Sequence, residues 1–387
     1  MRTEFEISHI ISGFREAFIQ KYHPSNNTLK VLNALEQCRT SALGGHVYLC
    51  PDCNAFKVSY NSCRNRHCPK CQGFEREKWV IARKEDILPV KYFHVVFTLP
   101  GALHPLCLSN KKAAYGILFR AAWDTLNAFA SKHGIQTGAI TILHTWNTQL
   151  GYHPHLHCIV PAGGITTQRK WKELPNASND SPFLFPVKAL SKVFRAKFIA
   201  MLGKNQIILD PGVRKALFKK EWVVYSKHPF CKIEKTVEYL GRYSHRVAIT
   251  NRRIKQIDDG KVTFEYKDRK DGGINKLMTL DAEDFLHRFS LHFIPKNIVR
   301  IRHYGFLSAC NKEKLNSLQR EFDIPLSPRK RNKVKWMDAC EQITGVPFLQ
   351  CPCCQCSEMV LFQTVLPYRR GPPATISPDL DFYRQPA

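Results

Sequence analysis

The segment from Gly151 to Val160 carries the residues best suited to chemistry in this chain. It places His155 and His157 two positions apart in an apolar, strand-like run. Side chains alternate between the two faces of a strand, so both imidazoles are expected on one face and Leu156 on the other, toward the core. Two adjacent imidazoles can hold one divalent metal ion, and such an ion can polarise a phosphodiester bond.

Spacing alone leaves metal binding open, because histidine pairs also occur at surfaces and as hydrogen-bonded polar groups in a core. The apolar Cys-Ile-Val after His157 favours a rigid central strand. His153 is a candidate third ligand, although Pro154 can set it off the strand. Neutral imidazoles favour softer ions such as Mn²⁺, whereas phosphate chemistry commonly uses Mg²⁺. We therefore expect a catalytic Mg²⁺ or Mn²⁺ on His155 and His157.

Two tyrosines supply a candidate nucleophile. Tyr239 and Tyr243 lie four positions apart, which predicts one face of a helix. Such pairs usually pack in a core, but Arg242, His245 and Arg246 around them suit a phosphate-bearing substrate. A phenol with its ordinary pKa of about 10 is a weak nucleophile and needs a polarised phosphate or a nearby cation. Metal and tyrosine together predict nucleophilic cleavage of DNA, with Arg242 and Arg246 contacting the DNA.

The overall charge points to the same substrate class. The 387 residues include 58 Lys and Arg against 32 Asp and Glu, a formal net charge of +26. A polyanion explains this excess, with nucleic acid as the usual partner and an anionic membrane surface as the competitor. The chain shows no apolar run of the ~18–20 residues that a spanning helix needs, and its start does not resemble a signal peptide. We expect a cytoplasmic protein without a membrane partner.

The chain has fifteen cysteines, which are expected to be reduced inside a cell and therefore to serve as metal ligands. Cys50 and Cys53 form one C-x-x-C pair, and Cys68 and Cys71 form another after fourteen intervening residues. This spacing predicts that the four thiolates bind one tetrahedral Zn²⁺. A site with four protein ligands has no open position, so this zinc is expected to be structural.

Further donors and cations lie around these pairs. His46, Cys63 and His67 could replace one of the cysteines or build a second site, and Cys63 could equally pack without a metal. Arg64 and Arg66 lie between the two pairs and predict a basic finger that docks on DNA, although the same charges could simply be solvated.

The C-terminal region contains a second cysteine-rich segment. Residues 351–356 read Cys-Pro-Cys-Cys-Gln-Cys, which holds two overlapping C-x-x-C pairs. Cys310 and Cys340 are candidate partners, and a cysteine-rich loop without metal is an equal alternative. Residues 367–387 are rich in proline and charge and are expected to be disordered.

Hydrophobic periodicity predicts alternating helices and short strands. A strand, a helix and two further strands in the middle of the chain indicate a layered α+β unit. Helices are expected over the first ~45 residues and at about 74–87, 111–133, 187–202, 213–225, 233–243 and 281–287. Strands are expected at 92–99, 139–146, 155–160 and 298–306, with a hairpin of 247–249 and 262–266.

Taken together, these motifs resemble transposases of the insertion-sequence-ninety-one family, members of the HUH endonuclease superfamily. The resemblance runs from about residue 10 to 360, in the family's order. The segments that carry it are residues 63–71, 95–100, 143–146, 153–157, 239–249 and 299–305.

The resemblance implies an α+β fold with a central HUH endonuclease domain, in which helices pack on an RRM-like antiparallel sheet. We expect an N-terminal helical and zinc-binding domain at 1–88, the HUH catalytic domain at 89–310, and a C-terminal cysteine-containing region with a disordered tail at 311–387.

By the same resemblance, His155 and His157 are the metal ligands, and Tyr239 and Tyr243 are paired nucleophiles. Some relatives keep a single tyrosine, and its sequence context then favours Tyr243. One tyrosine would attack single-stranded DNA at an element end, form a 5′-phosphotyrosine link and release a 3′-hydroxyl for rejoining, as in rolling-circle-type transposition. The chain would act in the cell on the bacterial nucleoid.

Partners and alternatives follow from the same motifs. The sequence contains no G-x-x-x-x-G-K-[ST] loop, so a host helicase would supply any unwinding. The alternatives are a rolling-circle replication initiator or relaxase-like nickase, and a catalytically inactive zinc-dependent DNA-binding protein. Both histidines and both tyrosines are present, which argues against the inactive protein.

Overall fold

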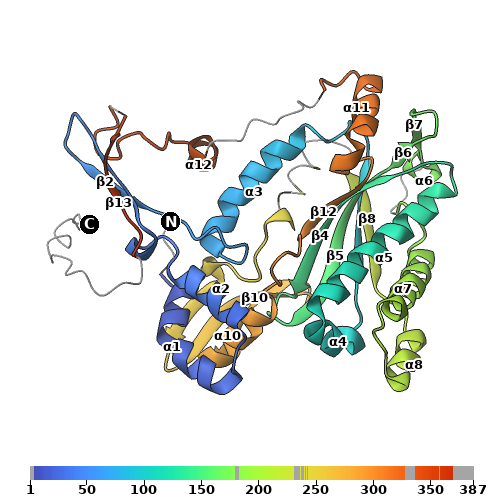
Figure 1. Ribbon diagram of the computed structural model, residues 1–387, viewed down its shortest axis with the longest axis horizontal. Coiled ribbons are helices and arrows are strands. Elements are labelled where there is room, and N and C mark those ends of the chain that lie inside the picture. Colours follow the sequence, from blue (N-terminus) through green and yellow to red (C-terminus); the bar gives the residue numbers. More distant parts are fainter. Residues whose placement is uncertain are drawn as a thin grey trace. The chain divides into compact units, whose positions relative to one another are not determined.

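A computed structural model describes residues 4–178, 183–230, 236, 239, 241, 243–326, 336–356 and 358–368 (Figure 1). Helices and antiparallel sheets together confirm the α+β class. The chain separates into two compact units, one formed by residues up to 36 with 65–347 and the other by residues 37–64 with those from 348 onward. These boundaries differ from the predicted 88 and 310, because a C-terminal strand returns to pair with a strand near the N-terminus.

The larger unit is built around a five-stranded antiparallel sheet. Its order is β12-β4-β5-β3-β8. The strands are β3 (Tyr92–Thr98), β4 (Gly138–Trp146), β5 (Tyr152–Pro161), β8 (Val224–Phe230) and β12 (Ile301–Gly305). The predicted strands at 92–99, 139–146, 155–160 and 298–306 are thereby confirmed, and they include all three central strands.

The remaining elements of this unit are mostly helices. The α-helices are α1 (Ile7–Tyr22), α2 (Asn26–Glu36), α3 (Pro69–Lys84), α4 (His104–Ser109), α5 (Lys111–Ser131), α6 (Pro175–Ser178), α7 (Val187–Lys204), α8 (Pro211–Lys219), α10 (Ala282–Leu291), α11 (Lys312–Glu321) and α12 (Trp336–Thr344). The small strands are β6 (Gly163–Ile165), β7 (Trp171–Glu173), β9 (Ile254–Asp258), β10 (Lys261–Asp268) and β11 (Ile274–Asp281). Short 3-10 turns are η2 (Gly101–Leu103), η3 (Asn251–Arg253) and η4 (Ala309–Asn311).

Two predicted elements differ from the structure. The predicted helix at 213–225 ends as α8 at Lys219, and the β-rich residues that follow form the edge strand β8. The predicted hairpin of 247–249 with 262–266 is also wrong. Strand β10 pairs instead with β9 and β11, because residues 254–258 and 274–281 supply its partners.

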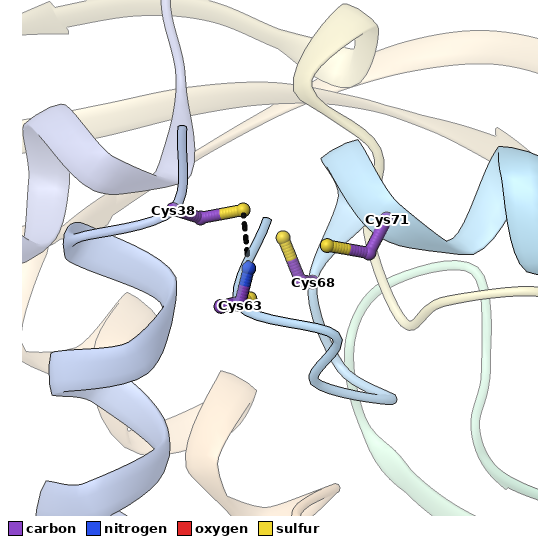
Figure 2. A group of neighbouring side chains, drawn as sticks. All are labelled: Cys38, Cys63, Cys68 and Cys71. Carbon is purple, nitrogen blue, oxygen red and sulfur yellow. Dashed lines mark hydrogen bonds between the residues drawn. The ribbon is translucent and has the colours of Figure 1, made fainter. Parts of the chain in front are cut away.

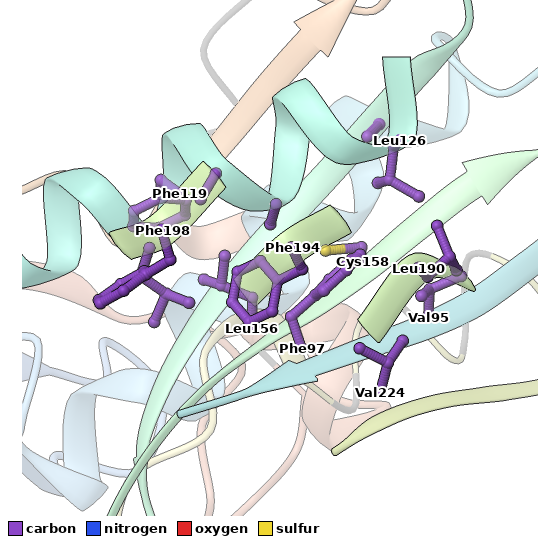
Figure 3. Packing of buried hydrophobic residues seen from close by; sticks show 14 of the residues in the cluster. Val95, Phe97, Phe119, Leu126, Leu156, Cys158, Leu190, Phe194, Phe198 and Val224 are labelled. Carbon is purple, nitrogen blue, oxygen red and sulfur yellow. The ribbon is translucent and has the colours of Figure 1, made fainter. Parts of the chain in front are cut away.

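One face of the central sheet packs against α5 and α7 in the main hydrophobic core (Figure 3). Phe97 and Leu156 from the strands meet Phe119 of α5 and Phe194 of α7, and all four are almost fully buried. Burying one such side chain contributes roughly 1.5–3 kcal/mol, so this layer holds the sheet rigid.

The opposite face of the sheet carries histidines beside aliphatic residues. Strand alternation places His94 on the same side as Tyr92, His144 on the same side as Ile142, and His157 on the same side as Ile159. These apolar neighbours belong to a second core with Trp79 and Val80 of α3 and with Tyr239 and Tyr243. The candidate ligands and nucleophiles therefore lie on one face of one rigid sheet.

The smaller unit contains η1 (Ser41–Leu43) and a three-stranded antiparallel sheet of order β13-β1-β2. Its strands are β1 (Gly45–Leu49), β2 (Phe56–Tyr60) and β13 (Val360–Val365). Gly44, just before β1, has a φ of +67°, and a Cβ there would lie 2.5 Å from the carbonyl oxygen of Val365. Only glycine allows the two ends of the chain to approach so closely at this point.

Within the described part of the chain, no helix has both the length and the apolar character needed to cross a bilayer.

Candidate active site

Three histidines converge on the tyrosine-bearing face of the sheet. His144, His155 and His157 each offer a ring nitrogen, and these atoms all lie within 4.8 Å of one another. His144 faces His155 across the β4–β5 ladder, and Nε2 of His155 lies 3.2 Å from Nε2 of His157. The structure therefore brings the two predicted ligands together and adds His144, which the sequence did not identify as a ligand.

Neighbouring groups select the tautomers of these rings. Nδ1 of His155 donates to the carbonyl oxygen of His153 at 2.7 Å, which leaves its Nε2 as the lone-pair donor. Nε2 of His144 donates to the carbonyl oxygen of Tyr243 at 2.9 Å, which leaves its Nδ1 as the lone-pair donor. Hydrogen bonds of this kind orient imidazole ligands and raise their basicity. His153, the candidate third ligand, contributes its backbone carbonyl to the orientation of His155 instead.

Burial keeps these imidazoles neutral. It lowers the pKa of His155 to about 4 and the pKa values of His144 and His157 well below the usual 6.5. The lone pairs needed for a metal are therefore available at neutral pH. Three neutral nitrogens at this spacing fit a divalent transition ion such as Mn²⁺.

Both predicted nucleophiles lie beside this group. The hydroxyl of Tyr239 lies 3.3 Å from that of Tyr243, and the ring centroid of Tyr243 lies 4.3 Å from that of His157. Both positions have helical backbone, as expected, and both side chains are half-buried. The carbonyl of Tyr243 that binds His144 connects the tyrosine segment directly to the histidine group.

A fourth histidine, which sequence reasoning missed, links Tyr239 to the group. Nδ1 of His94 lies 2.8 Å from the hydroxyl of Tyr239, and Nε2 of His94 lies 2.8 Å from Nδ1 of His157. His94 is nearly inaccessible to solvent, and burial lowers its pKa to about 3. The only sequence signal was its place in the predicted strand at 92–99.

A buried arginine holds the end of the tyrosine segment. The Nη2 group of Arg300 donates to the carbonyl oxygen of Ser244 at 2.7 Å, and its Nη1 group donates to that of Arg246 at 3.1 Å. Arg300 directly precedes β12, so these bonds tie the segment to the edge of the sheet. They fix where Tyr243 lies relative to the strands.

Exposed cations surround the site. After burial, which is the larger cause, Arg246 and Arg269 lower the pKa of His155, and Lys227 lowers that of His94. Lys227 pairs with His94 across β3 and β8. This positive potential suits a phosphodiester backbone. The predicted DNA contact Arg246 is thus near the histidines, whereas the predicted contact Arg242 lies outside the described residues.

The cysteines group differently from the prediction. The single site of Cys50, Cys53, Cys68 and Cys71 is wrong, because the two C-x-x-C pairs join different partners. The sulfur atoms of each group lie within 4.8 Å of one another. One group is Cys38, Cys63, Cys68 and Cys71 (Figure 2), and the other is Cys50, Cys53, Cys351 and Cys354.

Local structure explains the new partners. Cys68 directly precedes α3 and Cys71 lies in its first turn, while the backbone N–H of Cys63 donates to the sulfur of Cys38 at 3.5 Å. Cys50 lies in the turn between β1 and β2, which faces the C-terminal segment. Both groups suit structural zinc, since each offers four thiolates.

The other residues predicted around the cysteines have separate roles. Nε2 of His67 accepts the N–H of Ile294 at 3.2 Å, and the guanidinium of Arg66 donates to the carbonyl oxygen of Ile298 at 2.5 Å. The Arg66 guanidinium therefore uses at least one of its donors on the backbone. Arg64 is exposed, with a φ of +52°.

Two family models match this chain, one over the histidine and tyrosine site and one over the N-terminal cysteines. Residues 138–314 match the family model described as "Putative transposase", and residues 10–99 match the model described as "Transposase zinc-binding domain". The first match contains the three histidines and both tyrosines.

Curated relatives extend the match to the full chain. The chain is 38% identical over 397 residues to "Putative transposase y4qJ" of Sinorhizobium fredii (strain NBRC 101917 / NGR234), covering 96% of this chain and 98% of that relative. It is 30% identical over 291 residues to "Transposase for insertion sequence element IS801" of Pseudomonas savastanoi pv. phaseolicola, covering 70% of this chain and 68% of that one. Among solved structures, a conjugative relaxase, TrwC, aligns over 60% of this chain and 73% of its own, with 12% identity and a TM-score of 0.23.

The fold and the matches define the class, a transposase with an N-terminal zinc-binding domain. The chain belongs to the insertion-sequence-ninety-one (IS91) family of transposases.

Proposed function

We propose that this transposase cleaves and rejoins single-stranded DNA through a 5′-phosphotyrosine intermediate, in rolling-circle-type transposition. One observation carries the proposal: the hydroxyls of Tyr239 and Tyr243 lie 3.3 Å apart beside a group of three neutral histidines. Nucleophile and metal ligands on one rigid face are the arrangement that phosphodiester transfer needs.

The metal site would consist of Nδ1 of His144 and Nε2 of His155 and His157. A divalent ion held there, Mg²⁺ or Mn²⁺, would withdraw charge from the scissile phosphate. Three neutral nitrogen ligands favour Mn²⁺ of the two. The exposed Arg246 and Arg269 would bind flanking phosphates, and we retain Arg64 and Arg242 as further DNA contacts.

Metal binding by His157 would also determine which ring nitrogen of His94 carries the proton. With Nε2 of His157 used as a ligand, its Nδ1 carries the proton and donates to Nε2 of His94. Nδ1 of His94 must then carry a proton itself and donate to the oxygen of Tyr239. A charge-assisted hydrogen bond to this oxygen stabilises the phenolate, which is the reactive form of the side chain.

The strand transfer needs no nucleotide cofactor, because each step forms one bond to phosphorus as another breaks. The phenolate oxygen of one tyrosine forms a bond to phosphorus as the bond from phosphorus to the 3′-oxygen breaks, and that oxygen leaves as a 3′-hydroxyl after taking a proton. The 5′ side of the break stays on the protein. A 3′-hydroxyl then attacks the phosphotyrosine and restores the phenol. A host helicase would supply single strands of DNA inside the cell.

A covalent-capture experiment tests this proposal. Single-stranded oligonucleotides that tile the DNA flanking the gene are labelled at the 3′ end and incubated with protein and Mn²⁺. The label should move to the protein and survive denaturing electrophoresis, because the 5′-phosphate of the labelled fragment joins the tyrosine. The other cleavage product, from the 5′ side of the cut, should end in a free 3′-hydroxyl.

Variants separate chemistry from binding. The double variant Y239F/Y243F should lose the adduct and keep DNA binding. The control Y266F, which alters a tyrosine in β10, should keep both. An adduct that persists in the double variant would show that another residue is the nucleophile. Binding by the wild type without any cleavage would favour an inactive DNA-binding protein.

A further inference from the structure

The turn that holds Cys50 and Cys53 has a counterpart near the C-terminus. After Cys53, Asn54 has a φ of +56°, and its N–H donates to the carbonyl oxygen of Cys50 at 3.1 Å. After Cys354, the next residue repeats this geometry.

In that second turn, Gln355 has a φ of +58°, and its N–H donates to the carbonyl oxygen of Cys351 at 3.1 Å. The two C-x-x-C segments thus adopt the same tight turn, with a non-glycine residue in the left-handed region in each. Such strained residues persist where the surrounding structure or a ligand requires them.

The two turns bring their cysteines face to face. Cys50 Sγ lies 3.6 Å from Cys354 Sγ, and Cys53 Sγ lies 3.6 Å from Cys351 Sγ. A tetrahedron with Zn–S bonds of about 2.3 Å has sulfur–sulfur edges of roughly 3.8 Å, whereas a disulfide needs about 2.05 Å. The four sulfurs have the separation of ligands around a shared ion, and all four cysteines are free.

The surroundings hold both turns in place. Cys50 and Cys351 are buried in a small core with Tyr48 and Met359. The N–H of Met359 donates to the carbonyl oxygen of Leu349 at 2.7 Å and closes a hairpin around the second turn. The β1–β2 hairpin carries the first turn, so each pair of thiolates comes from the tip of a hairpin. Strand β13 follows the second hairpin and pairs with β1.

We propose that Cys50, Cys53, Cys351 and Cys354 bind a second structural Zn²⁺, which completes a zinc ribbon assembled from the two ends of the chain. This ion is distinct from one held by the group that contains Cys68. The matched zinc-binding model ends at residue 99, so half of this ligand set lies outside it. The site is independent of the proposed strand transfer. With four thiolate ligands, it fastens the C-terminal segment and has no position for substrate.

Zinc content tests the assignment. Full-length protein is purified without chelator, and zinc per chain is measured by mass spectrometry of the element. The variant C351S/C354S should contain one zinc per chain less than the wild type. The matched control C353S/C356S changes the two other cysteines of the same segment and should contain as much zinc as the wild type. Equal zinc in C351S/C354S and the wild type would overturn the proposal.

A conservative variant guards against misfolding. In C354H the imidazole replaces one thiolate, and zinc content should be kept. Both proteins are then loaded with Co²⁺ in place of zinc, and their absorption spectra are compared. In C354H, one of the two cysteine sites should change from the spectrum of four sulfur ligands to that of three sulfurs and one nitrogen. A spectrum identical to that of the wild type would show that Cys354 is not a ligand.

Discussion

The hydroxyl of Tyr239 lies 2.8 Å from Nδ1 of His94. This contact distinguishes the two tyrosines, since Tyr243 lies against the ring of His157 and has its backbone bound by His144. Tyr239 is therefore hydrogen-bonded to a histidine through its reactive oxygen, whereas Tyr243 is hydrogen-bonded to one through its main-chain carbonyl.

This difference predicts that His94 assists Tyr239 selectively. In the Y243F background, H94A should slow adduct formation about 10- to 100-fold, the worth of one hydrogen bond to a charged oxygen. H94N should restore part of the rate, because the asparagine amide can donate in place of Nδ1. The rate is measured by quenched-flow covalent capture.

The same substitution provides its own control. In the Y239F background, H94A should have a much smaller effect, with Mn²⁺ at saturation in both backgrounds. Equal losses in the two backgrounds would mean that His94 acts through the metal ligands alone.

His144 is expected to be the third metal ligand. H144A should weaken Mn²⁺ binding by more than the 10- to 100-fold that loss of an outer hydrogen-bond partner costs. H153A should bind Mn²⁺ nearly as the wild type does, because the backbone of His153 orients His155. Isothermal titration calorimetry compares the two variants, and the reverse ranking would favour His153 over His144 as the third ligand.

Exposed cations should govern the salt dependence of DNA binding. Each phosphate contact removed should lower the slope of log K against log salt by ~0.7 on single-stranded DNA. We expect this decrease for R269A, since Arg269 lies near the histidine group. Lys276 pairs with Asp268 and Asp271, so K276A should leave the slope unchanged. Fluorescence anisotropy at several salt concentrations measures the slope for each variant. Equal slopes for R269A and the wild type would show that Arg269 does not contact the DNA.

His303 should make the fold sensitive to acid. Burial, with a smaller contribution from Arg83, lowers its pKa to about 4, and its Nε2 is buried with no hydrogen-bond partner among the residues that the structure describes. Between pH 6.5 and 4 the unfolded chain therefore binds more protons than the folded chain, and stability falls as the pH falls.

The variant H303L should remove this dependence. Between pH 7 and pH 5, the wild type should lose roughly 1–2 kcal/mol more free energy of unfolding than H303L. Urea unfolding at the two pH values measures the difference, in which the shared effects of metal loss cancel. Parallel losses in both proteins would exclude His303 as the cause.

The sequence predicted the candidate ligands that share one strand, because alternation within a strand is a local property. His155 and His157 needed only this rule. His144 could not be assigned, since its contact depends on register. Trp146 pairs with Tyr152 next to the turn, and unbroken counting from there would place His144 opposite Pro154. An irregularity in the ladder places it opposite His155 instead.

The cysteines show the same limit over a longer range. The two C-x-x-C pairs nearest in sequence were the natural partners for one ion, and each pair does place both of its sulfurs in one cysteine group. Which turns meet is decided by β1, which pairs with β13 as well as with β2. That pairing lies beyond any local pattern, so Cys351 and Cys354 could not be assigned to Cys50 and Cys53 in advance. Cys63 was recognised only as a possible replacement donor, and Cys38 was not recognised at all.

The pairing of β1 with β13 has a consequence for biosynthesis. Cys50 and its partner Cys354 are 304 positions apart, so at about 5–20 residues per second a ribosome needs roughly 15–60 s to deliver the second after the first. Throughout that interval the growing polypeptide carries β1 and β2 without β13, and Cys50 and Cys53 without the two cysteines that face them. A prematurely terminated product would keep this defect, and cellular quality control could distinguish it from a completed transposase.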